Sequence, residues 1–324
     1  MTQIDYESYI KQLDEFRIRT YDESELDEHI FESYAYKKPF VARLSKPIAA
    51  WSMQDLMEKF GDEVFRQEYM DWPLKLYSQY MNHNIDETPL YLFDCKSKAH
   101  DALKFDIPLQ NVFGRDYFTL LGKERPDHQW LIVGPKRSCS SFHKDPNATS
   151  AWNSIVSGRK YWIMFPPSSP PPGVWTNDDQ SEVTATVSLA EWFHSGFYME
   201  ALESPGFCHA VTGPGDCMYV PSGWWHAVVN LDDCIAMTGN FVARPHLNEV
   251  AHFLKNKRDQ ISGFSKPDEL YDMFDDLLHK NNPEVFETEE DGTEVIAQPK
   301  KRKTWAETTS TSQPFTFSFN LDAE

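Results

Sequence analysis

The pattern of hydrophobic and polar positions changes twice along the chain, near residue 129 and again near residue 245. In the first part, over 1–128, apolar residues recur at helical spacing in several segments, with short apolar runs between them. Ser52 is a predicted helix cap before one such segment, and residues 39–44 are a predicted strand. We therefore expect an N-terminal support region that mixes helices and strands.

The middle part, over 129–244, has a different pattern. Short runs rich in β-branched and aromatic residues alternate with turns that contain glycine or proline. This spacing favours a β-sandwich or barrel over alternating strands and helices. A proline-rich break over 166–176, followed by a short helix capped by Ser188, interrupts it. The predicted fold class is therefore mainly β, with helical N-terminal and C-terminal extensions.

The last part begins with two apolar stripes at helical spacing, which predict C-terminal helices over 245–286. Each stripe is a packing surface, either against the β-rich part or against a second copy of the chain. A homodimer through these helices is therefore one expectation. The remaining residues, 287–324, are rich in threonine, serine, glutamate and lysine. This composition predicts a disordered tail.

Composition narrows the class of protein. The 324 residues carry a net charge of -19, with 50 acidic against 31 basic side chains, and 40% are hydrophobic. An acidic globular protein attracts basic partners and repels phosphate backbones, so a nucleic-acid partner is not expected unless a local basic patch exists. The five cysteines form no C-x-x-C pair and the opening residues are polar, which predicts reduced thiols in an intracellular compartment. No apolar run is long enough to cross a bilayer, so no membrane domain is expected.

One triplet is a candidate metal-binding motif: His143-Lys144-Asp145 is the only H-x-D in the chain. About one such triplet is expected by chance, so the triplet alone is weak evidence for a metal site. Its β-type flanks strengthen the evidence, because metal ligands need rigid support. A second histidine, His226, begins a β segment, and eighty residues lie between Asp145 and His226. Two imidazoles and one carboxylate are the donor set of non-haem Fe(II) oxygenases, whereas a closed structural zinc site would require cysteines. Taken alone, His226 is more simply a core histidine at the start of a strand.

The turn Ser157-Gly158 joins two β-type segments, and we interpret it as a two-residue hairpin turn. In that register Lys160 faces Ile155, and Asn153 shares the same face of the sheet. Asn153 and Lys160 would then line one cavity. A buried lysine needs an anionic partner, which a dicarboxylate supplies, although an exposed strand lysine is the more usual case.

Together, the triplet at 143–145, Lys160 and the run GDCMYVPSGWWH over 215–226 resemble the Jumonji-C (JmjC) family of Fe(II)- and 2-oxoglutarate-dependent oxygenases. The resemblance covers roughly residues 39–242. The run DPNATSAWNSIVSGRKYWIMFPP is similar in particular to the small lysyl-hydroxylase and arginine-demethylase subgroup. The resemblance implies a double-stranded β-helix, a jelly-roll or cupin-like barrel, as the core over 129–244.

The same resemblance implies a role for each matching residue. Three ligands would hold Fe(II), and Lys160 would pair with the C5 carboxylate of 2-oxoglutarate. Ser140 stands where the subgroup has threonine, so the hydroxyl is kept and the methyl group is lost. The implied iron ligands are His143, Asp145 and His226, and the implied co-substrate contacts are Lys160, Asn153, Thr238, Ser140, Tyr91 and Asn240.

One of these implied contacts depends on the turn between the last two β-type segments of the middle part. A two-residue hairpin turn at Asp232-Asp233 would place Thr238 on the face opposite to His226. A three-residue loop or a bulge would place Thr238 and Asn240 on the same face as His226. The resemblance requires the loop or the bulge.

The expected cofactor and co-substrates are therefore Fe(II), 2-oxoglutarate and O2. The implied activity is hydroxylation of lysine or arginine side chains in a basic protein or peptide, in keeping with the acidic net charge. The alternatives are demethylation of histone lysine or arginine, an oxygenase that acts on RNA or a small molecule, and a catalytically silent binding scaffold. The cysteines cannot build a zinc-finger reader domain, which favours hydroxylation over histone demethylation.

The run Pro299-Lys300-Lys301-Arg302-Lys303 is the only basic cluster, and it lies in the predicted tail. Such a run is typical of a nuclear localisation signal. The expected location is therefore the nucleus, with the cytoplasm as a second compartment. The alternative interpretation is a solvated charged tail.

Overall fold

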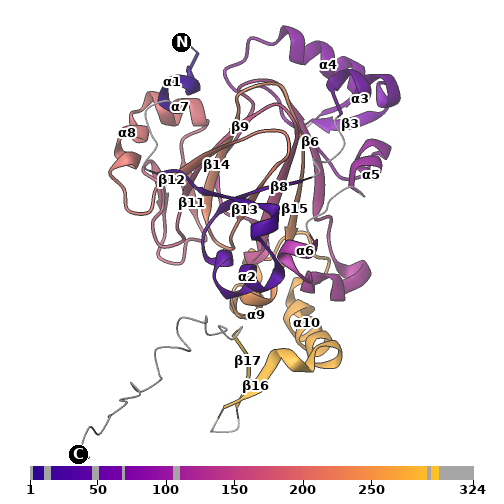
Figure 1. Ribbon diagram of the computed structural model, residues 1–324, viewed down its shortest axis with the longest axis vertical. Helices are drawn as coiled ribbons and strands as arrows, with labels where there is room; N and C mark the ends of the chain where they lie inside the picture. The colour runs from indigo at the N-terminus through magenta and orange to yellow at the C-terminus, as the bar shows by residue number, and fades with distance from the viewer. Residues whose placement is uncertain are drawn as a thin grey trace, which may run out of the picture.

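The computed structural model describes residues 3–10, 16–45, 51–67, 70–104, 110–289 and 293–298. The larger of two central sheets has nine strands in the order β1-β2-β13-β8-β15-β6-β5-β3-β4 (Figure 1). Its neighbouring strands are antiparallel, except for β1 with β2. The strands are β1 (Arg19–Asp22), β2 (Phe40–Arg43), β13 (Asp216–Val220), β8 (Ser150–Ser157), β15 (Cys234–Phe241), β6 (Gln129–Gly134), β5 (Leu92–Asp94), β3 (Val64–Gln67) and β4 (Met70–Pro73).

The smaller central sheet has four antiparallel strands in the order β12-β9-β14-β7. These are β12 (Cys208–Thr212), β9 (Lys160–Phe165), β14 (Trp225–Asn230) and β7 (Cys139–His143). A two-stranded sheet of β10 (Val174–Thr176) and β11 (Val183–Ala185) follows the proline-rich break. The expectation of a mainly β chain with helical extensions is confirmed at this level. The first five strands come from the predicted support region yet belong to the larger sheet, and the division of the chain into regions stays a prediction.

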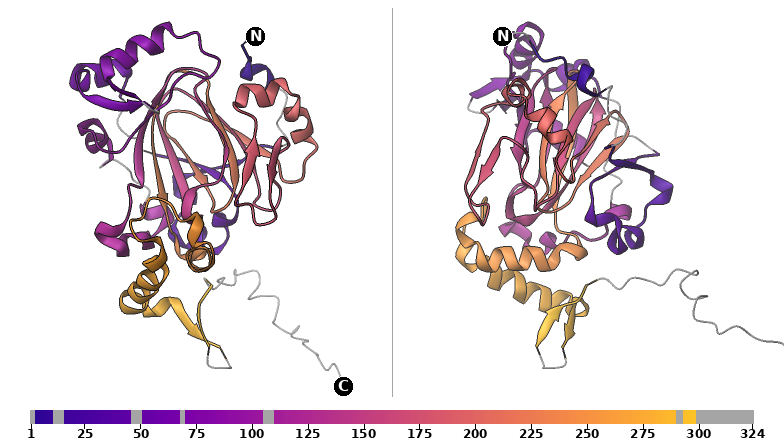
Figure 2. Two further views of the ribbon diagram at one scale, coloured as in Figure 1. Left: turned by 180° about the vertical axis from the view of Figure 1, so that it is seen from behind. Right: turned by 90° about the vertical axis from the view of Figure 1, so that its left-hand side faces the viewer.

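Helices lie at both ends of the two sheets: α3 and α4 at one end, α9 and α10 at the other (Figure 2). The α-helices are α1 (Tyr6–Ile10), α2 (Glu28–Ser33), α3 (Met53–Phe60), α4 (Leu74–His83), α5 (Lys98–Lys104), α6 (Gln110–Phe113), α7 (Leu189–His194), α8 (Phe197–Leu202), α9 (Leu247–Asn256) and α10 (Pro267–Asn281). The 3-10 segments are η1 (Glu23–Glu25), η2 (Ala35–Lys37), η3 (Tyr117–Glu124), η4 (Pro146–Ala148), η5 (Arg244–His246), η6 (Arg258–Gln260) and η7 (Pro283–Val285).

Two predicted helix caps are confirmed. The hydroxyl of Ser52 accepts from the backbone N–H of Asp55 at 3.2 Å, and the Asp55 carboxylate accepts from the Ser52 N–H at 2.8 Å. Ser188 caps α7 in the same way through the N–H of Glu191. Each cap satisfies backbone donors that a helix leaves without an internal partner, which is worth about 1 kcal/mol.

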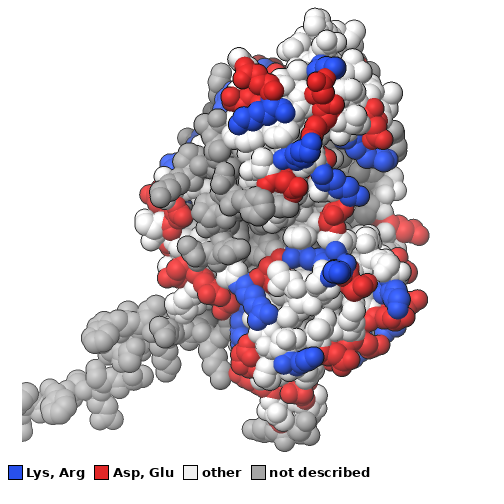
Figure 3. Space-filling model, turned by 90° about the vertical axis from the view of Figure 1, so that its right-hand side faces the viewer, with Lys and Arg blue, Asp and Glu red and all other residues white. Residues whose placement is uncertain are grey.

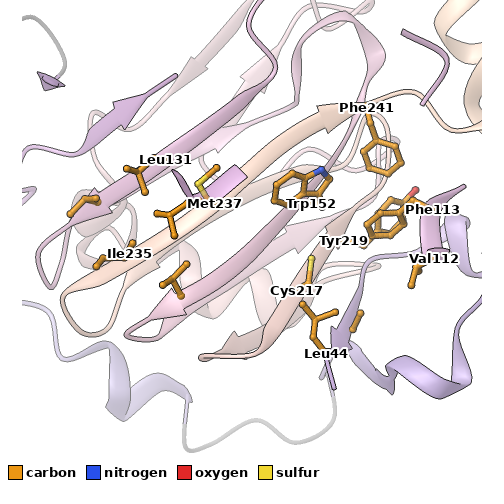
Figure 4. Packing of buried hydrophobic residues seen from close by; sticks show 14 of the residues in the cluster. Leu44, Val112, Phe113, Leu131, Trp152, Cys217, Tyr219, Ile235, Met237 and Phe241 are labelled. Carbon is orange, nitrogen blue, oxygen red and sulfur yellow. The ribbon is translucent and has the colours of Figure 1, made fainter. Parts of the chain in front are cut away.

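One face of the nine-stranded sheet packs against the N-terminal helices. Successive strand residues alternate between this face and the other, so Trp152 and Met237 point outward while their neighbours Asn153 and Thr238 do not. Phe113 of α6 packs on the outward face (Figure 4), with ring centroids 5.5 Å from Tyr219 and 5.0 Å from Phe241. Full burial of each such side chain stabilises the fold by about 1.5–3 kcal/mol.

The inward faces of the two sheets meet in a small apolar cluster. Apart from Ile18, which precedes β1, its buried members come from both sheets: Trp162, Met164, Ala210 and Val228 from the four-stranded sheet, and Val41, Ala151, Met218 and Val220 from the nine-stranded sheet. This cluster holds the sheets face to face. Polar residues replace it further along the same strands, and there the sheets enclose a cavity instead of a core.

The predicted hairpin at Ser157-Gly158 is wrong. β8 pairs with β13 and β15, whereas β9 pairs with β12 and β14, so the turn crosses from one sheet to the other. The turn between β14 and β15 crosses in the same way, which removes the premise of the second hairpin argument. A glycine at a tight turn is compatible with both connections. Long-range pairing of each strand decides between them.

Substitution of Gly158 tests this crossing. Gly158 has a φ of 77°, and an added Cβ would lie 2.3 Å from the backbone oxygen of Asp233. We expect Gly158→Ala to lower the free energy of unfolding by about 2–4 kcal/mol, because strain and a backbone clash add together. Gly196→Ala is the matched control: φ is 83° and no atom lies within 4 Å of the added Cβ, so only the strain of about 1 kcal/mol applies. Equal losses in urea unfolding would contradict the tight crossing.

The C-terminal helices pack inside this chain. Val250 and Leu254 of α9 are buried with Leu270, Phe274 and Leu278 of α10, in a cluster that also includes residues of η3. The prediction of a disordered tail from residue 287 is wrong for its first part. Strands β16 (Phe286–Thr288) and β17 (Glu294–Ile296) pair there, because Phe286 and Ile296 pack on the helical cluster. The predicted basic cluster at 299–303 lies outside the described residues.

Charged side chains of both signs are interspersed on the face of the molecule shown in Figure 3. The net charge of -19 is therefore not gathered into one acidic patch on this face. Within the ranges described, no helix is long and apolar enough to span a bilayer.

Candidate metal centre

Three metal-binding side chains meet at one end of the four-stranded sheet. His143 is the last residue of β7, Asp145 follows it, and His226 is the second residue of β14. β14 pairs with β7 so that His226 lies opposite His143, and their ring centroids are 4.1 Å apart. Nε2 of His226 is 3.9 Å from Oδ2 of Asp145, and one donor atom from each residue lies within 4.8 Å of the others. The sheet register thus brings together residues that are far apart in the sequence.

Both imidazole rings are oriented by backbone carbonyls. Nδ1 of His143 lies 2.7 Å from the oxygen of Ser141, and Nδ1 of His226 lies 3.1 Å from the oxygen of Trp224. Each Nδ1 therefore carries the proton and donates it, which leaves Nε2 of each ring as a lone-pair donor for a metal. The two carbonyls thus fix the orientation of the rings, which metal-binding histidines require.

The electrostatics of the cluster fit a divalent metal. Burial, followed by the neighbouring His143, lowers the pKa of His226 to about 4, so its ring is neutral at physiological pH. Oδ2 of Asp145 is buried and has no hydrogen-bond partner among the described residues. A buried carboxylate oxygen without a partner is costly unless a cation binds it. Two imidazoles and this carboxylate are the donor set that suits Fe(II) with open coordination positions.

A cavity of about 210 Å³ adjoins the cluster between the two sheets. Its walls are partly apolar, with Trp130, Ile132 and Trp162 among them. It brings together every site residue that the sequence predicted: His143, Asp145, His226, Lys160, Asn153, Thr238, Ser140, Tyr91 and Asn240. The polar residues reach one cavity although the two predicted hairpins do not form, because β8 and β15 turn one face inward and β9 and β14 face them from the other sheet.

Lys160 lies inside this cavity, with only 1% of its surface exposed. Its Nζ donates to Oδ1 of Asn230 at 2.8 Å and to the hydroxyl of Tyr91. Burial lowers its pKa to about 8. Among the described residues, Lys160 forms no ion pair with a carboxylate. The cavity therefore contains a buried cationic group that an anion entering the cavity can pair with.

Three further polar side chains line the wall of the nine-stranded sheet. Thr238 lies opposite Asn153 in the pairing of β15 with β8, and both face the cavity. The hydroxyl of Thr238 donates to the backbone oxygen of Trp152 at 2.7 Å, whereas Oδ1 of Asn153 is buried and has no partner in the described part of the chain. Asn240 continues the same face two residues on, and its amide donates to Thr149 at 3.1 Å. Asn153 therefore offers an acceptor to a bound molecule.

Sequence reasoning missed Asn230. It is fully buried, lies opposite Lys160 in the pairing of β14 with β9, and orients the lysine Nζ. Its own amide is held by the hydroxyl of Ser138 at 2.8 Å and the oxygen of Gly134 at 3.4 Å. In the sequence, Asn230 is the last residue of a β-type run, before the turn Leu-Asp-Asp, so only its position opposite a candidate buried lysine could have indicated its role.

A larger groove of about 790 Å³ opens over His143 and Asp145. We call it the substrate groove. One wall comes from α9, and the other comes from residues 179–183, between β10 and β11. Lys257 ties the two walls by donating to the backbone oxygen of Asp179 at 2.7 Å. Lys144 contacts Gln180, and its Nζ lies 4.7 Å from the centre of the Trp225 ring. Such a groove can hold an elongated molecule with one side chain directed at the metal donors.

Comparison with known proteins places residues 130–241 in a family described as "JmjC domain, hydroxylase". The chain is 36% identical over 280 residues to arginine-specific demethylase JMJ22 of Arabidopsis thaliana, covering 84% of this chain and 55% of that protein. It is 32% identical over 216 residues to the bifunctional arginine demethylase and lysyl-hydroxylase psr-1 of Caenorhabditis elegans, covering 62% and 53%. It is 28% identical over 250 residues to the 2-oxoglutarate and iron-dependent oxygenase JMJD4 of Mus musculus, covering 70% and 56%.

The chain spans about half the length of these relatives. The matched segment, 130–241, contains the three metal donors, Lys160 and most of the cavity lining. The donor chemistry of the cluster and the printed names of the relatives agree on iron and 2-oxoglutarate. The chain therefore belongs to the JmjC family of 2-oxoglutarate- and iron-dependent oxygenases.

Proposed function

We propose that this chain uses Fe(II), 2-oxoglutarate and O2 to hydroxylate lysine or arginine side chains of a basic protein or peptide. One observation carries the proposal: a three-donor cluster and a buried lysine without a carboxylate partner among the described residues share one cavity. In this proposal the nine-stranded and four-stranded sheets are the two halves of a double-stranded β-helix, a jelly-roll or cupin-like barrel.

Bound Fe(II) with 2-oxoglutarate would supply the oxidising chemistry, in which O2 converts 2-oxoglutarate to succinate and CO2 and one oxygen atom enters a substrate C–H bond. In the chain itself, His143, Asp145 and His226 would hold the metal. The carbonyls of Ser141 and Trp224 keep the two rings in the required tautomer.

The remaining cavity residues bind and orient the co-substrate. Lys160 pairs with its far carboxylate, and Tyr91 and Asn230 hold the lysine Nζ in place for that contact. Asn153 and Thr238 line the opposite wall and fix the orientation of the bound molecule. The apolar walls exclude water, which strengthens each of these polar contacts.

The charged residues that line the substrate groove favour a target side chain that carries a positive charge. Glu249 of α9 lines this groove and has no ion-pair partner within the described ranges, whereas Lys257 is already engaged by Asp179. A carboxylate without an ion-pair partner in the groove that opens over the metal donors favours a lysine or arginine over an acidic residue. The printed names of JMJ22 and psr-1 state activities on arginine and lysine, which agrees with this substrate class.

Demethylation is the second candidate, because two of the relatives compared are named arginine demethylases. Hydroxylation of an N-methyl group gives an unstable product that loses formaldehyde, so the same site would serve both reactions. The first and second candidates differ only in which carbon of the substrate side chain lies nearest to the metal.

Mass spectrometry of basic peptides distinguishes these candidates. We expect lysine- and arginine-rich peptides to gain the mass of one oxygen when incubated with the chain, Fe(II), 2-oxoglutarate and air. Methylated versions that lose a methyl group and release formaldehyde would instead favour demethylation. Asp145→Ala is the negative control for either product. Consumption of 2-oxoglutarate that only RNA or a small molecule stimulates would favour those substrates, and no consumption at all would favour a silent scaffold.

Two further proposals concern the whole protein. The basic cluster at 299–303 supports location in the nucleus, with the cytoplasm as a second compartment. A homodimer through the C-terminal helices would have to use their exposed faces, since their apolar stripes are buried within the chain. Deletion of 299–303 with no change in location would contradict the first proposal.

A further inference from the structure

A second groove, of about 750 Å³, lies away from the metal donors. We call it the basic groove. Its described lining consists of residues 16–19, 21, 34–35, 37–40, 166, 206–208 and 224. It lies where the segment around β1 and η2 meets the start of β12, and Arg17 bridges to His209 of β12.

The charge of this lining is the reverse of that of the chain. Arg17, Arg19, Lys37 and Lys38 all line the groove and are exposed, and its described lining contains no aspartate or glutamate. The whole sequence has 50 acidic against 31 basic side chains, so four cations without a carboxylate form a local basic patch. The electrostatic potential here therefore attracts anions although the protein as a whole repels them.

Three of these cations, Arg19, Lys37 and Lys38, form no ion pair with a carboxylate among the described residues. The guanidinium of Arg19 lies 4.1 Å from the centre of the Tyr21 ring, and Nζ of Lys37 lies 5.6 Å from that of Tyr36. The charges of the three residues are therefore available to a partner.

The rest of the lining is apolar. Phe16, Phe40, Phe207 and Trp224 contribute aromatic surface, and Tyr34 stands at the rim with 53% of its surface exposed. A groove with an apolar lining and positive charges along it suits a chain that carries both apolar and anionic side chains.

We propose that the basic groove binds an acidic peptide segment of a protein partner, with apolar side chains in the groove and carboxylates on Arg19, Lys37 and Lys38. A single-stranded nucleic acid fits these features less well. Nucleic-acid bases stack on the open faces of exposed aromatic rings, whereas Phe40 and Phe207 in this lining are only 2% and 4% exposed.

The basic groove and the substrate groove share the short segment 223–225 as a common wall. Gly223 and Trp225 line the substrate groove, whereas Trp224 between them lines the basic groove. The acidic segment would therefore bind on one side of residues 223–225, and the metal donors lie on the other side. An acidic segment in the basic groove would hold its protein on the enzyme and leave the substrate groove free. That protein could be the substrate itself or a protein that recruits the enzyme.

Fluorescence anisotropy with the full chain tests the proposal. The probe is a fluorescein-labelled peptide of three Glu-Asp-Leu-Phe repeats. We expect Lys37→Glu/Lys38→Glu to weaken its binding about tenfold, since two favourable charge contacts become repulsive. Lys123→Glu/Lys280→Glu makes the same change in net charge at two exposed lysines outside the groove, and should weaken binding by less than about twofold.

One altered probe and one competitor complete the experiment. A peptide with serine in place of leucine and phenylalanine should bind about tenfold more weakly, because it cannot fill the apolar lining. Equal losses in the two double variants, or equal binding of the serine peptide, would overturn the proposal. An oligouridylate that binds more tightly than the acidic peptide and displaces it would assign the groove to nucleic acid instead. Thermal unfolding confirms that each variant is folded.

Discussion

Alanine at any one of His143, Asp145 or His226 is expected to weaken Fe(II) binding by at least about a hundredfold and to lower 2-oxoglutarate consumption by about a thousandfold. The three donor atoms lie within 4.8 Å of one another and act as one site, so two donors cannot replace three. Anaerobic calorimetry measures the Fe(II) affinity directly, and the loss of 2-oxoglutarate is followed in air.

Two groove residues provide the matched controls for this experiment. His252 and Asp179 line the substrate groove but do not belong to the donor cluster. His252→Ala and Asp179→Asn should therefore keep Fe(II) affinity within about twofold of the original chain. If Asp145→Ala binds Fe(II) as tightly as these controls, the metal site lies elsewhere.

Substitution of Lys160 should separate co-substrate binding from metal binding. We expect Lys160→Met to raise the KM for 2-oxoglutarate by about a hundredfold, because a buried charge pair is lost, while Fe(II) affinity stays nearly unchanged. Lys257→Met removes a lysine from the substrate groove and should leave the KM for 2-oxoglutarate unaffected. A KM for Lys160→Met close to that of the original chain would contradict the assignment of this cavity.

The same substitution should stabilise the chain in the absence of ligand. Burial lowers the pKa of Lys160 from its usual 10.5 to about 8, so keeping it charged costs about 3 kcal/mol at neutral pH. Between pH 8 and 10.5 the unfolded chain holds this proton and the folded chain has released it, so the free energy of unfolding rises with pH. Lys160→Met should lack this rise and be more stable below pH 8. Parallel pH profiles in urea unfolding would refute the explanation.

The chemistry-bearing residues were more predictable from sequence than the strand pairing. The face that Asn153 shares with Ala151 depends only on the alternation of side chains within β8, which is a local property. The partner of β8 depends on contacts with β13 and β15, more than sixty residues away, and the turn Ser157-Gly158 contains no information about them. A correct set of inward residues therefore followed from an incorrect hairpin.

The sequence pattern predicted neither the substrate groove nor the basic groove. Gln180 and Asp179 follow a proline-rich break without periodicity, and their contacts to Lys144 and Lys257 are tertiary. The four cations of the basic groove occur in the sequence as two separate pairs, and only folding brings the two pairs together. The hairpin of β16 and β17 was missed because its polar composition resembles that of a disordered tail.

The most direct test of 2-oxoglutarate-dependent oxygenase activity is the formation of succinate by the purified chain with Fe(II), 2-oxoglutarate and a lysine-rich peptide. Mass spectrometry should detect succinate in air and none under argon, with an oxygen-sized mass gain on the peptide. His143→Ala and Asp145→Ala should form neither product. Succinate that persists in these two variants, or its absence from the original chain under all of these conditions, would contradict the account.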